Sequence, residues 1–275
     1  MKMGINSIGK GLLSLAAFEP FKERLFLTLW VAAFISNVGT WMQNVGVSWL
    51  AATLSASPFL ISLIQTAASL PALLFSYPAG VISDHSDRRK LLLWLQGFLF
   101  FVVLALSVCA YLQILEMRLL IAFTFLTGVG SALTTPVWQA ITPEVVSKGQ
   151  LKEAIALNGV NFNLARAIGP ALGGVILALW GAKAIFLCNA VSFLALGWGI
   201  YTWHNTPSTF KTVKFRETAR EGLREVRKSI PFRHVLIRTV SFTFFVSIIF
   251  AFLPQLSKYE WKQTSGQYTW LWVAR

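Results

Sequence analysis

Seven long apolar runs constrain this chain more than any other feature. A helix needs about 20 mostly apolar residues to cross the hydrocarbon core of a bilayer. Only 13% of the residues are charged, against about 25% in a typical soluble domain. The sequence therefore predicts an all-α, polytopic membrane helix bundle with the lipid bilayer as its partner. The runs are Leu25–Leu54, Phe59–Ile82, Leu91–Leu115, Leu119–Ile141, Ile155–Trp180, Ala182–Trp203 and Val235–Leu256.

The net charge of +13 does not indicate nucleic-acid binding, because the basic residues follow the loops. They collect in the tail before the first run and in the loops after the second, fourth and sixth runs. The other loops carry almost none. This positive-inside pattern predicts that the N-terminus lies in the cytoplasm. We also expect the membrane to be the inner membrane of a bacterium. No cleavable signal pattern precedes the first run, so we expect that span to be retained.

The same boundaries predict four parts. They are a cytoplasmic tail over 1–24, a six-helix transmembrane domain over 25–203, a basic cytoplasmic linker over 204–234, and the start of a second domain over 235–275. Apolar residues at helical spacing over 215–230 predict an amphipathic helix, either on the membrane face or as a solvated connector. Similar segments at 77–82 and 169–176 lie in the second helix of each group of three, as in the repeats of transporter folds.

The segment Gly80–Lys90, after the second run, carries the strongest motif. Gly80 allows two helices to approach closely. Asp84 can accept an N–H from the start of the next helix or pair with a basic group. A loop that only sets topology would need the basic residues Arg88, Arg89 and Lys90, and would leave the glycine and the aspartate unexplained.

This segment resembles the signature between the second and third helices of major facilitator transporters, Gly-x-Leu-Ala-Asp-Arg-x-Gly-Arg-Arg-Lys. His85 replaces the first arginine of that signature and Asp87 replaces its second glycine. The resemblance implies that Asp84, Arg88 and Arg89 latch the two six-helix halves together on the cytoplasmic side.

A second motif lies in the fifth run. Ala165, Gly169 and Gly173 recur every four residues, which leaves one helix face almost free of side chains and able to pack closely. Pro170 removes a helix hydrogen bond and permits a bend. Together with Gly174, this string resembles the fifth-helix motif of antiporter members of the same superfamily, which implies export. The alternative is ordinary tight packing.

Further matches are similar to the transmembrane secretion effector branch, which includes enterobactin exporters. The resemblance implies the N-terminal six-helix half of a major facilitator fold plus helix seven, truncated soon afterwards. It also implies alternating access about a site between two halves. The matching strings are Trp41-Met42-Gln43, Pro136–Ala140, Pro143-Glu144, Ala156–Asn158 and Asn163–Arg166.

Arg166 is the only charge deep in a span, where its insertion costs at least ~2.5 kcal/mol. It either meets an anionic group of a substrate or a gate, or is bonded structurally to carbonyls and amides. Asn37, Trp41 and Asn44 share one helical stripe. Each polar residue alone could join helices, whereas together they could line an amphiphilic path. The candidate path residues are Asn37, Trp41, Gln43, Asn44, Gln65, Gln139, Asn158, Asn161 and Arg166.

No feature predicts an enzyme, a cofactor or a metal site. The string Gly4–Gly11 lacks the final Ser or Thr of a phosphate-binding loop and has no strand before it. His85, His204 and His234 are scattered. A proton is an open candidate for the coupling ion, although no Asp or Glu lies deep in a span. We expect a secondary exporter of a small amphiphilic molecule, siderophore or drug-like; the alternative is a truncated, non-transporting half-transporter fragment or an interaction protein.

Overall fold

The structure is a computed structural model that describes residues 17–54, 57–203, 234–235, 237–239, 241–242 and 245. The chain divides into two compact units, Met1–Thr212 and Val213–Arg275. The described residues of the second unit are all helical. Most of the predicted seventh span, the amphipathic helix over 215–230, residues 1–16 of the predicted tail and nearly all of the predicted linker lie outside the described residues.

Six helices in the first unit are long and apolar enough to cross a membrane. Their presence confirms the predicted all-α membrane bundle. Short 3-10 turns, η1 (Glu19–Lys22) and η2 (Lys148–Gln150), precede α2 and α6. The helices are α2 (Arg24–Leu54), α3 (Pro58–His85), α4 (Arg88–Tyr111), α5 (Met117–Val145), α6 (Leu151–Trp180) and α7 (Ala182–Thr202).

Several helix ends differ from the ends of the apolar runs. α3 continues to His85 and α4 begins at Arg88, because a charged side chain ends an apolar run without breaking backbone hydrogen bonds. The segment 142–154, between the fourth and fifth apolar runs, is mostly helical for the same reason. In contrast, α4 ends at Tyr111 and not at Leu115, since Gln113 adopts a left-handed φ of 58° that an α-helix cannot contain.

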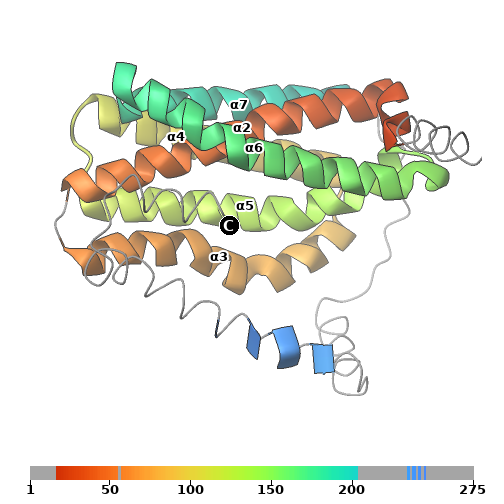
Figure 1. The fold of residues 1–275 in the computed structure, drawn as a ribbon, viewed down its shortest axis with the longest axis horizontal. Helices are drawn as coiled ribbons and strands as arrows, with labels where there is room; N and C mark the ends of the chain where they lie inside the picture. Colours follow the sequence, from red (N-terminus) through yellow and green to blue (C-terminus); the bar gives the residue numbers. More distant parts are fainter. Residues whose placement is uncertain are drawn as a thin grey trace, which may run out of the picture. The chain divides into compact units, whose positions relative to one another are not determined.

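The helices pair in a pattern that is symmetric between the first three and the last three. α2 packs on α6 and α7, α5 packs on α3 and α4, and α4 packs on α7 (Figure 1). If α2, α3 and α4 are exchanged with α5, α6 and α7, the two pairs made by α2 become the two pairs made by α5, and the pair of α4 and α7 is unchanged. This is the pairing that a three-plus-three repeat produces.

One face of α4 contributes a row of buried apolar side chains to the core. Leu92, Leu95, Leu99, Val103 and Leu106 recur every three or four residues and are all buried, which is the spacing of one helix face. Leu92 belongs to one apolar cluster, and Leu99, Val103 and Leu106 belong to another; both clusters join α4 to α5 and α7. The charged residues at the ends of α4 therefore lie on a helix whose position is fixed by packing.

Candidate functional site

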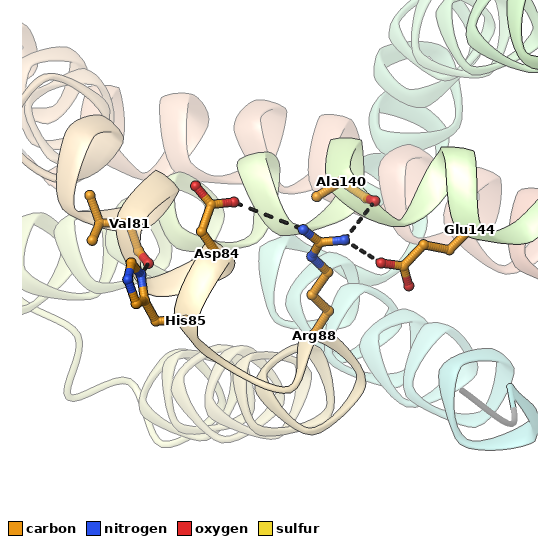
Figure 2. Close-up of polar contacts among 6 residues, drawn as sticks. All are labelled: Val81, Asp84, His85, Arg88, Ala140 and Glu144. Atoms are coloured by element: carbon orange, nitrogen blue, oxygen red, sulfur yellow. Dashed lines mark hydrogen bonds and ion pairs between the residues drawn. The ribbon is translucent and has the colours of Figure 1, made fainter. Parts of the chain in front are cut away.

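The turn between α3 and α4 forms a charge cluster with the last turn of α5, and Figure 2 shows its contacts. Arg88, the first residue of α4, forms an ion pair with Glu144 and donates a hydrogen bond to Ala140 O at 3.3 Å. Its second ion pair, with Asp84, is 3.9 Å long. The Arg88 and Glu144 side chains are 23% and 21% exposed, whereas that of Asp84 is 65% exposed. Arg88 is therefore bound mainly to α5.

All three charges oppose the dipole of their own helix. Asp84 and Glu144 lie in the last turns of α3 and α5, and Arg88 lies at the start of α4. Anions are stabilised at helix N-termini and cations at C-termini, so each of these charges is unfavourable alone. Glu144 was not predicted to be a partner of Arg88. Its carboxylate at the end of an apolar run was the signal that a cation should lie nearby.

Arg89 binds the C-terminal end of α7. Its Nη2 donates to Tyr201 O at 2.6 Å and its Nε to Ile200 O at 3.4 Å. Its guanidinium also lies 5.5 Å from the centroid of the Tyr201 ring. Both carbonyls lie in the last turn of α7, where carbonyls lack an i+4 partner, although Ile200 O also accepts the Trp203 N–H at 3.1 Å. Arg89 therefore helps to cap α7 and joins it to α4. The latch role implied for Asp84, Arg88 and Arg89 stays a prediction, and in this unit both arginines already bind their own bundle.

Other motif residues differ in detail from the expectation. Asp87, and not Asp84, accepts the backbone N–H of Lys90 at 3.1 Å and so caps α4. His85 Nδ1 donates to Val81 O at 2.7 Å (Figure 2). Apart from the adjoining part of α3 itself, no atom of the described residues lies within 4 Å of the position that a Cβ would take at Gly80. The close helix approach predicted there is thus not made within the described part of the chain.

The glycine motif of the fifth run packs against α2. A Cβ at Gly173 would lie 3.1 Å from Met42 Cα, and one at Gly169 would lie 3.1 Å from Val38 O. The predicted close packing of this face is therefore confirmed. Pro170 and Gly174 lie on the exposed side of α6, and a Cβ at Gly174 would have open space.

Two of the predicted path residues join α2 to α6. Asn161, which is buried, accepts from Asn37 Nδ2 at 2.9 Å and donates to Trp30 O at 2.8 Å. Trp30 in turn donates from Nε1 to Leu157 O at 3.0 Å. In this unit both asparagines act as interhelical hydrogen-bonding groups.

Two further path residues also join helices. Gln43 Oε1 accepts from Asn189 Nδ2 at 2.6 Å between α2 and α7, and both side chains are buried. Asn158 Nδ2 donates to Thr142 Oγ1 at 3.2 Å between α6 and α5. Asn189 was not predicted to have a functional or structural role.

The remaining path candidates are more accessible. Asn44, Gln65, Gln139 and Arg166 are exposed, and Trp41 is half-buried. The Trp41 ring meets Phe162 of α6 edge-on, with centroids 5.8 Å apart.

Arg166 lies near the middle of α6, one turn after Phe162. Side chains four residues apart share a helix face, so Arg166 follows Phe162 along the side of α6 that borders the Trp41 stripe. Arg166 forms no ion pair or hydrogen bond with another described residue. A mid-span cation on this face is thus left without a partner within the described part of the chain.

Comparison with known proteins gives consistent matches. The family model described as "Transmembrane secretion effector" matches residues 15–274. The staphyloferrin A transporter of Staphylococcus aureus is 30% identical over 189 residues, which are 68% of this chain and 46% of that protein. The macrolide efflux protein A of Streptococcus pyogenes is 21% identical over 60% of this chain and 41% of its own length. The chain therefore spans less than half the length of these two relatives.

Proposed function

We propose that this chain, which belongs to the transmembrane secretion effector family of major facilitator transporters, forms the first half of a secondary transporter. The complete transporter would export a small amphiphilic molecule by alternating access, in which two halves rock about a site near the bilayer midplane. Membership in this family and six apolar helices make the chain a multi-pass membrane protein.

The observation that carries the proposed path is that Arg166 has no partner among the described residues. A charge at the bilayer centre costs at least ~2.5 kcal/mol when it faces lipid. The exposed side of α6 that bears Arg166 therefore faces protein or a water-filled path in the working transporter. Trp41 and Asn44 of α2 extend the same wall. A cation beside an aromatic ring and an amide suits an amphiphile that carries an anionic group.

Export from the cytoplasm is the proposed direction. Support comes from the resemblance of Gly169–Gly174 to the antiporter motif and from the similarity to the macrolide efflux protein A of Streptococcus pyogenes. The orientation proposed is cytoplasmic for the N-terminus and for the turn with Arg88, in the inner membrane of a bacterium. It rests on the excess of basic residues in those segments.

The test is accumulation of a fluorescent amphiphile in cells that express the gene together with any in-frame sequence after Arg275. We expect expression to lower accumulation, and Arg166→Ala to abolish that effect at an unchanged protein level. Asn163→Ala is the matched control, because Asn163 is exposed on α6 and bonds only to Gly159 O of its own helix. Adding a protonophore tests whether a proton gradient drives export.

Two results would contradict the proposal. Full export by Arg166→Ala would remove Arg166 from the substrate path. Accumulation that rises on expression would indicate uptake and overturn the direction.

A further inference from the structure

An apolar groove of about 650 Å³ lies where the end of α4 meets the end of α6 and the start of α7. This is the end of α4 opposite Arg88. Leu104 and Val108 of α4, Leu179 and Trp180 of α6, and Leu187 of α7 form most of its wall. The groove is therefore lined by side chains that a hydrocarbon chain can contact without loss of hydrogen bonds.

One end of the groove carries polar groups. Lys183 lines it together with Ser107 and Tyr111. Its Nζ lies 5.0 Å from the centroid of the Tyr111 ring, and Ser107 Oγ donates to Lys183 O at 2.9 Å. The Tyr111 ring thus holds the ammonium group at the rim, and the Ser107 hydrogen bond fixes the backbone of Lys183. The ammonium group forms no ion pair with a carboxylate of the described residues.

The positive charge at this rim is larger than that of the lysine alone. Lys183 is the second residue of α7, whose first turn contains no acidic residue and whose N-cap position is a glycine without a side chain. The positive end of the helix dipole adds to the ammonium group. A negatively charged ligand is the complement of this arrangement.

The aromatic residues at the rim indicate how deep in the bilayer it lies. Trp180 and Tyr111 are 61% and 68% exposed, and exposed Trp and Tyr of membrane helices gather at the level of the lipid headgroups. Below them, α4 exposes Phe101 and α7 exposes Val191 and Leu194. The groove therefore runs from the headgroup level into hydrocarbon, as a lipid does.

We propose that this groove binds an anionic phospholipid. An acyl chain lies along Leu104, Val108 and Leu187, and the phosphate contacts Lys183 and the start of α7. The lipid comes from the leaflet at this end of the bundle. It stabilises the junction of α4, α6 and α7 from the outside, at a place where Lys183 pairs with no carboxylate of the described residues.

The test uses the chain in nanodiscs of phosphatidylcholine that contain a trace of phosphatidylglycerol with a photoreactive acyl chain. After illumination, mass spectrometry locates the labelled peptides. We expect phosphatidylglycerol to label residues 104–111 and 179–187 about fivefold more than a photoreactive phosphatidylcholine does, because one lysine near an anionic headgroup contributes about 1 kcal/mol. Lys183→Glu should remove this preference, and Lys183→Gln should reduce it.

Arg118→Glu is the matched control, because Arg118 is an exposed cation at the same end of the bundle that does not line the groove. It should keep the full preference. Equal labelling by the two lipids, or an unchanged preference in folded Lys183→Gln, overturns the proposal. So does cross-linking of the groove to a second protein copy in place of lipid. Size exclusion and thermal melting identify variants that have lost the fold.

Discussion

At the scale of single residues, Arg88 forms two ion pairs, one with a largely shielded carboxylate and one with an exposed carboxylate. We expect Glu144→Gln to lower the free energy of unfolding by about 1–2 kcal/mol, because Glu144 and Arg88 are both largely shielded and hydrogen bonds to charged groups contribute about 1.5–3 kcal/mol. Asp84→Asn should cost less than about 0.5 kcal/mol, since Asp84 is exposed and exposed pairs contribute little. Unfolding in a detergent titration measures both. A larger loss for Asp84→Asn would contradict this order.

The buried pair of Gln43 and Asn189 gives a second prediction for single residues. Interhelical hydrogen bonds in membrane proteins contribute about 0.6 kcal/mol on average and at most about 1.7. The short bond between these two amides should lie in the upper half of that range. A double-mutant cycle with Gln43→Ala and Asn189→Ala measures the coupling directly. A coupling near zero would mean that each amide finds another partner.

These residues also show what the sequence could and could not predict. The sequence alone identified Arg88 and Gln43 as unusual, because a motif or an apolar span surrounds each of them. Their partners Glu144 and Asn189 lie far away in the chain. Pairing at such separations depends on how helices pack, and no periodicity within one helix records it.

At the level of helices, α2 and α6 approach closely along the glycine face. Gly169→Ala should destabilise the bundle by about 1–3 kcal/mol, because the added methyl group would overlap Trp41 and crowd Val38 O. Gly174→Ala in the same helix has open space and should be neutral or slightly stabilising. Thermal unfolding of the two variants compares them. Equal losses would show that the effect arises from α6 itself and not from its contact with α2.

The spacing of Ala165, Gly169 and Gly173 predicted which face of α6 packs closely, and the structure confirms it. It did not predict that α2 is the neighbour, since a smooth face fits several helices equally well. Helix ends were also predicted only approximately. Hydropathy detects the hydrocarbon layer, whereas helix ends are set by caps such as Asp87 and by backbone conformations such as that of Gln113.

For the whole molecule, the loop charges predict one orientation in the membrane. Replacing Cys109 and Cys188 by alanine and introducing either Gln113→Cys or Ser147→Cys gives two reporters in exposed connections at opposite ends of α5. We expect a membrane-impermeant maleimide to label position 113 in intact spheroplasts, and position 147 only after the membrane is opened. The reverse result would invert the orientation and, with it, the cytoplasmic location proposed for Arg88.

The hydrogen bonds of α2 also determine when the bundle can be completed during synthesis. The hydrogen bond of Asn37 cannot form until Asn161 has been synthesised, 124 residues later. That of Gln43 cannot form until Asn189 has been synthesised, 146 residues later. At about 5–20 residues per second, roughly 6 to 30 seconds pass between the synthesis of these amides and that of their partners. During that interval α2 holds unpaired amides in or near the membrane, so it depends on the insertion machinery or a membrane chaperone until α6 and α7 arrive. Ribosome-bound chains that stop before α7 should therefore be degraded faster than chains that include it.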